Sequence, residues 1–246
     1  MFLSVRALVL FNQPYKEYDR ILGLLTKEHG VIRCVAVGAA KHGHQFFYGT
    51  QPGFLTDFVL RRSKNYWYVK EIEIIESFRK IQEDPCYLTA AAHILEIAGD
   101  VCVDIETSSQ VILLLLHTFY AMHDKNKEYK LVVCAFEWRI LSILGLSADL
   151  QAYTEENRSL YTCGLFSFSS CKLIYTNRIH AVENTILLSN GAIEALSYIQ
   201  NISIDRLFSF TLQADVLDEL EKVTHRYLCE RLEKKYDKMN LLSFYS

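Results

Sequence analysis

The spacing of hydrophobic residues changes near residue 80 and divides the chain into two regions. Before that point hydrophobic and polar residues tend to alternate, which is typical of β-strands with one buried face. We expect five strands, over residues 5–11, 20–26, 31–37, 54–62 and 66–75, with a hairpin turn at 63–65. Five strands with glycine-marked bends and no helix between them favour a small closed barrel. The OB-fold is the five-stranded version that binds oligonucleotides, although an SH3-like barrel fits the same composition.

Strand alternation also assigns side chains to faces, because residues two apart point to the same side. In the first strand it places Val5, Ala7, Val9 and Phe11 on one face. In the fifth strand it places Tyr66, Tyr68, Lys70, Ile72 and Ile74 on one face, and Trp67, Val69, Glu71 and Glu73 on the opposite face.

After residue 80 the hydrophobic period becomes helical. Helices are predicted from Asp84-Pro85 to near Asp104, from Ser108 to Met122, and over 129–146, 190–199 and 214–236. Residues 147–190 lose this period and predict a small irregular or β-containing insertion. The sequence therefore predicts an α+β protein: an OB-fold domain over 1–80 and a mostly helical domain over 81–246. No flexible linker is visible between them, so the barrel is expected to pack directly onto the helices.

Charge is distributed unevenly between the two regions. The 246 residues carry a net charge of −3, yet residues 1–80 hold 12 Lys and Arg against 7 Asp and Glu, and the remainder holds 14 against 22. A cationic barrel followed by an anionic helical region suggests a polyanion binder with a separate protein-docking half. The longest apolar stretch, 111–122, is shorter than the ~18 residues of a membrane span. Seven scattered cysteines indicate a reducing compartment, and we expect the cytoplasm.

Several segments, in order, resemble bacterial RecO, the recombination mediator family. They are Leu8-Val9-Leu10, Tyr15-Lys16-Glu17-Tyr18-Asp19-Arg20, Leu24 to Gly30, and Val35 to Ala39. Further along, Phe136 to Leu146 followed by Asp149-Leu150 resembles the helix that precedes the family's zinc insertion. Each segment is a weak signal by itself, whereas the ordered set covers most of the chain.

The resemblance implies an N-terminal OB-fold, a helical C-terminal domain and no covalent chemistry. It also implies binding to single- and double-stranded DNA, annealing of complementary strands, and recognition of the acidic, Phe-ended tail of single-strand-binding protein. With RecR, and in many cases RecF, such proteins help to load RecA onto coated single strands. These implications place the protein at the nucleoid.

Two departures from the family pattern matter. The loop Ala40 to Tyr48, which is rich in Arg and Lys in relatives, holds one Lys and two His here, so weaker DNA binding is expected. Cys163, Cys171 and His180 stand where relatives carry zinc ligands, but no pair has CxxC-type spacing. We expect no cofactor and no metal.

The predicted nucleic-acid site combines cations with loop aromatics. Basic side chains on a barrel can follow phosphates, and exposed rings can stack on bases at roughly 1–3 kcal/mol per base. The alternative is an ordinary solvated surface, with the aromatic residues of the fifth strand closing the barrel core. The candidates are Arg6, Lys16, Arg20, Arg33, Lys41, Phe46, Phe47, Arg61, Arg62 and Lys64, and Tyr48 adjoins the two loop phenylalanines.

A candidate partner site lies on the predicted helix over 129–146. An apolar pocket rimmed by a guanidinium suits an acidic peptide ending in Phe. The candidates are Phe136, Arg139, Ile143 and Lys130. The alternative is a structural Arg paired with Glu137 or Glu96.

These patterns leave three hypotheses. The leading one is a non-enzymatic recombination mediator with no membrane association. The second is a protein-interaction scaffold with little DNA affinity. Replacement of Lys41, Arg61 and Arg62 by Glu would leave its partner binding and any residual DNA affinity unchanged. The third is a thiol hydrolase that uses Cys163 or Cys171. It lacks a nucleophile-elbow pattern or any other recognisable site constellation.

Overall fold

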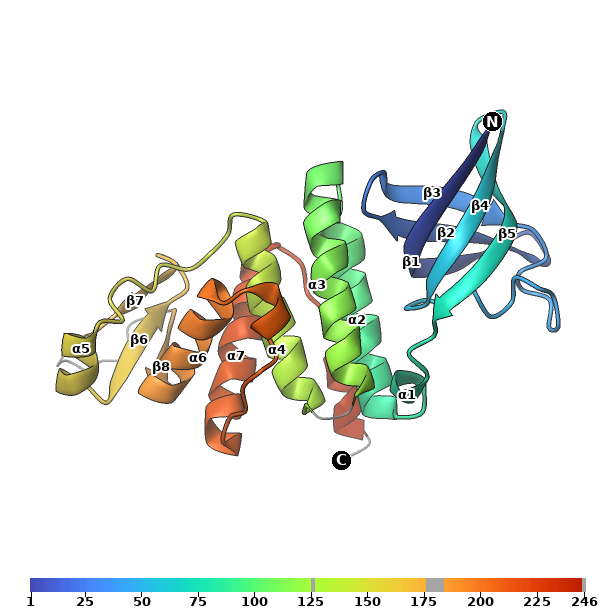
Figure 1. The fold of residues 1–246 in the computed structure, drawn as a ribbon. Helices are drawn as coiled ribbons and strands as arrows, with labels where there is room; N and C mark the ends of the chain where they lie inside the picture. Colours follow the sequence, from blue (N-terminus) through green and yellow to red (C-terminus); the bar gives the residue numbers. More distant parts are fainter. Residues whose placement is uncertain (125–126, 176–183, 245–246) are drawn as a thin grey trace. The chain divides into compact units, whose positions relative to one another are not determined.

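The computed structural model describes residues 1–124, 127–175 and 184–244. They form two compact units, residues 1–125 with 237–246, and residues 126–236. The first unit contains the barrel, two long helices and two short helical segments, and the second contains the other described helices and a small sheet (Figure 1).

Five strands close into the predicted OB-like barrel. They are β1 (Phe2–Tyr15), β2 (Asp19–Thr26), β3 (Gly30–Ala36), β4 (Leu55–Ser63) and β5 (Tyr66–Glu76). Their order is β1-β2-β3-β5-β4, and β4 pairs with β1 to complete the closure. Only the β3–β5 pairing is parallel among these strands. Inward-facing residues fill the barrel: Val5, Ala7, Val9, Leu22, Leu24, Ile32, Cys34, Ala36, Ala39, Phe46, Phe58, Leu60 and Val69.

Two β-bulges overturn the predicted assignment of faces. In β1, Val9 lies opposite Leu24 and Phe11 lies opposite Gly23, so Leu10 is an extra residue and Phe11 turns to the outer face. In β5, Val69 lies opposite Leu60 and Glu71 lies opposite Val59. The extra residue there is Lys70, and it lets Val69 and Ile72 both pack against the core. Simple alternation was therefore wrong beyond each bulge.

The two long helices of the first unit begin where aspartates cap them. The short α1 (Arg79–Gln82) is followed by α2 (Pro85–Val101), whose cap Asp84 accepts a hydrogen bond from the Cys86 amide at 3.0 Å. Asp104 accepts from the Thr107 amide at 2.7 Å and starts α3 (Ile105–His123), three residues before the predicted start at Ser108.

The barrel packs directly onto α2 and α3, as predicted. Gly53, just before β4, lies so close to these helices that an added Cβ would be 2.9 Å from the Phe119 ring. Phe78 packs edge-on against Phe119 with ring centroids 5.3 Å apart. The C-terminal η2 (Lys238–Phe244) also belongs to this unit, because Lys238 pairs with Glu96 of α2 at 2.8 Å.

The second unit surrounds an aromatic core. It contains α4 (Tyr129–Ile143), α5 (Glu155–Leu160), β6 (Cys163–Ser167), β7 (Lys172–Ile174), β8 (Thr185–Ser189), α6 (Asn190–Asn201), η1 (Ile204–Arg206) and α7 (Ala214–Arg231). The strands form an antiparallel sheet in the order β7-β6-β8 within the predicted insertion. Trp138 of α4, Phe166 of β6 and Tyr227 of α7 are buried against one another, with centroids 5.1–6.0 Å apart. No helix among the described residues is long and apolar enough to span a membrane.

Candidate nucleic-acid interface

Two hairpin turns of the barrel each present an exposed lysine. Lys16 stands between β1 and β2, and Lys64 stands between β4 and β5. Both adopt left-handed backbone conformations, with φ of 53° and 52°, which is the geometry that a tight turn demands. In OB-folds these two loops flank the outer face of strands 2 and 3, where oligonucleotides bind.

The outer face between these turns carries Arg33 and an aromatic ring. Leu22, Leu24 and Cys34 point into the core, so the alternate residues Gly23 and Arg33 point outward. Gly23 has no side chain, and the ring of Phe11 lies against its backbone; an added Cβ would be 2.2 Å from that ring. The Arg33 guanidinium lies 5.9 Å from the centroid of Phe11.

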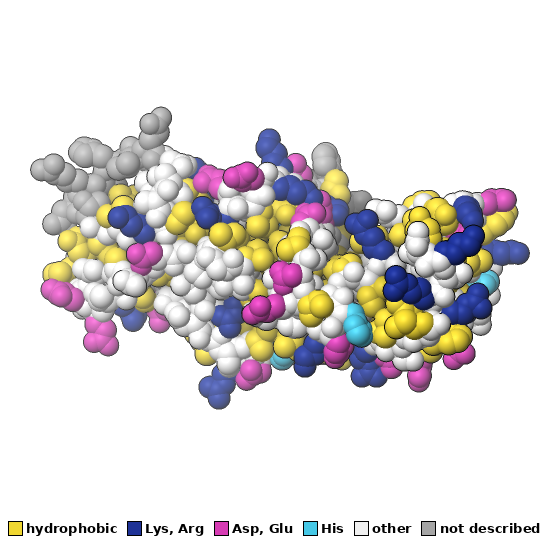
Figure 2. Space-filling model, turned by 90° about the horizontal axis from the view of Figure 1, so that it is seen from above, with side chains coloured by type: hydrophobic (Ala, Val, Ile, Leu, Met, Phe, Trp, Pro, Cys, Tyr) yellow, Lys and Arg dark blue, Asp and Glu magenta, His cyan; other side chains and the backbone are white. Residues whose placement is uncertain are grey.

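The face continues across β5 to β4. Val35 of β3 lies opposite Tyr68, and Tyr68 lies opposite Arg61. Arg61 is exposed and Tyr68 is half-buried, while Tyr66, two residues before Tyr68, is 60% exposed. We define the basic face as Lys16, Arg33, Arg61 and Lys64 together with Phe11, Tyr66 and Tyr68. Figure 2 shows Lys and Arg side chains interleaved with hydrophobic ones over the barrel.

Arg20 and Arg62 flank the basic face near the ends of their strands. Arg20 is half-buried and lies opposite Ala36 at the beginning of β2. Arg62 is exposed on β4, and its guanidinium lies 5.7 Å from the centroid of Trp67.

The long β3–β4 connection is anchored to the β1–β2 hairpin. The Gly38 amide donates to Asp19 at 2.9 Å, and the Ala40 amide donates to the Tyr18 carbonyl at 2.9 Å. These bonds bring exposed Lys41 to 5.9 Å from the centroid of Tyr18. Lys41 therefore adds a positive charge beside the hairpin that carries Lys16.

The aromatic residues of this connection have different environments. Phe46 is 5% exposed and belongs to the barrel core, so its expected role as a stacking platform is wrong in this conformation. Phe47 is half-buried and packs edge-on against Tyr48, with centroids 5.2 Å apart. Tyr48 is 60% exposed and presents the accessible ring of this group.

Arg6 does not join the basic face. Its guanidinium makes two hydrogen bonds of 2.8 Å to Asp57, which raise its pKa and lower the pKa of the Asp57 carboxyl. The pair borders a groove of about 560 Å³ that is also lined by Glu71 and Glu73. Because this groove is acidic, it would repel phosphates, and we withdraw Arg6 from the candidate contacts.

The predicted peptide pocket on α4 is not open at its central residues. Phe136 is fully buried. The Arg139 guanidinium donates to the carbonyls of Ile199, Gln200 and Ile202 at the end of α6, so it is neither a free clamp nor paired with Glu137 or Glu96. Burial lowers its pKa.

The other two residues of that candidate site have separate environments. Lys130 pairs with Glu221 of α7 at 3.0 Å, which raises the lysine pKa. Ile143 is half-buried at the end of α4. A guanidinium and an ammonium already engaged inside the unit cannot rim a peptide pocket without losing those contacts.

The two described residues at the zinc position, Cys163 and Cys171, do not converge. Cys163 begins β6, and Cys171 follows the turn at the strand's other end. Five residues of strand separate these ends by about 16 Å, too far for two thiolates to share one ion. The Cys171 thiol donates to the Phe168 carbonyl at 3.4 Å. His180 lies outside the described residues.

One aromatic residue of the basic face was missed in the sequence. Alternation assigned Phe11 to the core because the bulge at Leu10 leaves no mark in the hydrophobic pattern. Gly23, a glycine within a predicted strand, is the available signal, since such a glycine commonly marks close approach of another group.

These features define a protein with an OB-like barrel, a helical region and a basic, aromatic-containing face on one side of the barrel. A family model described as recombination protein O N terminal matches residues 1–78, and one described as recombination protein O C terminal matches residues 82–240. The chain therefore belongs to the RecO family of DNA repair proteins. Neither matched model describes an enzyme.

Curated relatives agree with this assignment over nearly the full length. The DNA repair protein RecO of Acetivibrio thermocellus is 32% identical, with 98% of this chain and 96% of that protein covered. RecO of Clostridium kluyveri is 26% identical over 98% of this chain and 94% of that protein. RecO of Thermoanaerobacter sp. is 23% identical over 98% of this chain and 97% of that protein.

Proposed function

We propose that this protein is a non-enzymatic recombination mediator that binds single- and double-stranded DNA through the basic face. The observation that supports this most is the separation of charge on the barrel. Arg61 and Lys64 lie at the β4–β5 hairpin, and Lys16 and Arg33 lie on the β1–β2 turn and on β3, whereas Asp57, Glu71 and Glu73 gather beside Arg6 farther along β4 and β5. Scattered surface charges would not be expected to separate in this way.

The proposed contacts favour the nucleic-acid backbone over base sequence. Lysine and arginine on the outer surface of strands neutralise phosphates and release counterions, which gives affinity without base readout. Exposed Tyr66 and Tyr48 supply rings that can stack on any base. Strand annealing follows from the same chemistry, because neutralising two strands together lowers their mutual repulsion.

The acidic helical region is proposed to dock partner proteins. By family membership these are RecR and the tail of single-strand-binding protein, with RecF and RecA as further partners during loading of coated single strands. The protein would act in the cytoplasm, at the nucleoid. Because Phe136, Arg139 and Lys130 are engaged internally, we assign no residues to these contacts.

The test is a binding titration with fluorescent single-stranded oligonucleotides. Replacing Arg33, Arg61 and Lys64 together by Gln should reduce affinity at least tenfold at low salt, because roughly three phosphate contacts are lost. The matched control replaces exposed Lys80, Lys222 and Lys235 by Gln. It changes the net charge equally but leaves the basic face intact, and it should retain wild-type affinity. Equal losses in both variants would contradict a localised site.

A scaffold with little DNA affinity is the second candidate. It is favoured by the single lysine among residues 40–48 and by the ion pair that neutralises Arg6. Replacing Lys41, Arg61 and Arg62 by Glu separates the two proposals. A mediator should lose oligonucleotide binding and annealing, whereas a scaffold should show neither activity before or after the change.

A further inference from the structure

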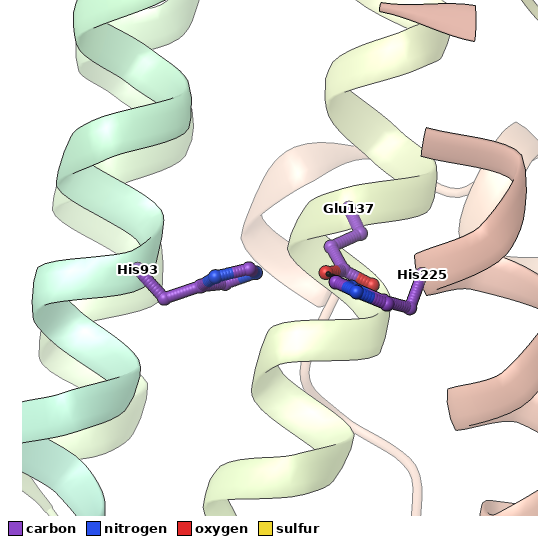
Figure 3. A group of neighbouring side chains, drawn as sticks. All are labelled: His93, Glu137 and His225. Carbon is purple, nitrogen blue, oxygen red and sulfur yellow. Dashed lines mark hydrogen bonds and ion pairs between the residues drawn. The ribbon is translucent and has the colours of Figure 1, made fainter. Parts of the chain in front are cut away.

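A cysteine, a histidine and a buried glutamate form a connected series between α4 and α7. The Glu137 carboxylate is 2% exposed and lies 3.0 Å from Nδ1 of His225. The other ring nitrogen of His225, Nε2, lies 3.7 Å from the Cys229 sulfur. Figure 3 shows Glu137 and His225 facing one another from the two helices; His93, also drawn there, belongs to the first unit.

The contacts of Glu137 favour one arrangement of protons on His225. The Thr224 hydroxyl donates to one Glu137 oxygen at 3.0 Å, and the other oxygen faces His225. A buried carboxylate strongly favours a proton on the facing Nδ1. That leaves Nε2 to accept the proton of the Cys229 thiol. An imidazolium held by Glu137 would then stabilise the thiolate, which is the logic of a nucleophile, base and orienting acid.

The location of His225 and Cys229 near the C-terminal end of α7 does not destabilise this ion pair. Residues 225 and 229 lie in the last two turns of a helix that ends at Arg231, where the dipole favours cations and disfavours anions. Because an imidazolium and a thiolate arise together, the dipole acts on a pair with no net charge. The dominant electrostatic influence is therefore the buried carboxylate.

The environment of Cys229 differs from the environments of the other cysteines. Burial raises the pKa of the Cys34 thiol to about 12 and that of Cys102 to about 11. Cys134 is completely buried, and its pKa is also raised. Cys229 is partly exposed, as are Cys86, Cys163 and Cys171. The Cys171 sulfur accepts a hydrogen bond from the Arg231 guanidinium at 3.7 Å. Among the described contacts of these four thiols, only the Cys229 sulfur pairs with a histidine that a carboxylate orients.

We propose that Cys229 is a reactive thiol and a modification site for small disulfides of low-molecular-weight thiols. The Cys229 thiolate attacks one sulfur of the disulfide; a new sulfur–sulfur bond forms as the old one breaks. The departing thiolate takes the proton held on Nε2 of His225. Glu137 remains ionised throughout and acts as a positioning residue.

The experiment treats the folded full-length protein with oxidised glutathione at pH 7 and follows each cysteine by peptide mass mapping. An ordinary thiol is only a few per cent thiolate at this pH, so we expect Cys229 to react about tenfold faster than Cys86 and Cys163. His225→Asn can still donate to Glu137 but cannot accept the thiol proton, and Glu137→Gln removes the charge. Both should lower the Cys229 rate to that of Cys163.

The proposal fails if wild-type Cys229 reacts no faster than Cys86 and Cys163, or if His225→Asn leaves its rate unchanged. Circular dichroism of each variant establishes that it is folded. Should the histidine variant unfold, Cys229→Ser provides the second measurement, since it must remove one rapidly formed glutathione adduct and leave the slow ones. Unfolding in denaturant should make all cysteine rates similar in the wild-type protein.

Discussion

At the scale of single residues, Arg139 shows how a tertiary contact gives a side chain a structural role that its position in the sequence did not predict. Its position on α4 suggested a clamp for an acidic peptide, but its planar guanidinium reaches three backbone carbonyls at the C-terminal end of α6. Those carbonyls have no partners within the helix ladder, because the last turn always leaves such acceptors unpaired. A fork of several donors suits this arrangement better than a single ammonium would.

Replacing Arg139 by Met should therefore destabilise the protein by about 1.5–3 kcal/mol, the range for hydrogen bonds that involve a charged group. Urea unfolding monitored by circular dichroism measures this free energy. Arg206→Met, at an exposed position in the same unit, is the control and should cost much less. Equal free energies of unfolding for the two variants would contradict a capping role.

The Arg6–Asp57 pair predicts a pH dependence at this scale. The pKa of Asp57 in the folded protein is lowered from its usual 3.8, chiefly by the Arg6 hydrogen bond. A lowered carboxyl pKa contributes stability above the unfolded-state pKa, and this contribution is lost as pH falls through the folded-state pKa. Asp57→Asn should therefore be less stable than wild type at pH 7.

The stability difference between Asp57→Asn and wild type should shrink as pH falls from about 4 toward 2, where the wild-type carboxyl also becomes neutral. Thermal melts across this range measure it. Arg6→Gln should show the same trend, since it removes the other partner. A difference that does not vary with pH would argue that the pair contributes nothing through its charge.

At the scale of elements, the join between barrel and helices depends on a glycine. Gly53 has φ of +85°, and an added Cβ would be 2.9 Å from Phe119 of α3. Both the backbone conformation and the space exclude a side chain there. Gly43 has a similar φ of +80° with open space around it, so the two positions separate conformational strain from crowding.

Gly53→Ala should destabilise the protein by roughly 2–4 kcal/mol, because left-handed strain adds to the cost of overpacking. Gly43→Ala should cost only about 1–2 kcal/mol from the strain. Chemical denaturation of the two variants gives the comparison. If both lose the same stability, the contact between Gly53 and α3 is not tight.

At the scale of the whole molecule, charge separation on the barrel sets the expected response to salt. For single strands, the logarithm of affinity falls with the logarithm of salt concentration by about 0.7 for each phosphate contacted. Neutralising Arg33, Arg61 and Lys64 should therefore flatten this slope by about 2. Fluorescence anisotropy at several salt concentrations measures the slope. A variant that loses affinity but keeps the wild-type slope would place these side chains away from the phosphates.

The sequence by itself determined the strands of the barrel, the hairpin turn at 63–65 and the helical region, because alternation, turn residues and helical spacing are local signals. It also determined the family resemblance and the excess of positive charge before residue 80. Only the tertiary structure decided which cations stay available. Arg6 and Arg139 are bound by residues 51 and at least 60 positions away, and no local pattern records such partners.

The same reason explains the misassigned faces and the missed cysteine. A bulge shifts register through the neighbouring strand, so Phe11 turned outward although its own spacing placed it inward. Glu137 and His225 are 88 residues apart in sequence. Their meeting, and the position of Cys229 beside them, depend on how α4 packs against α7.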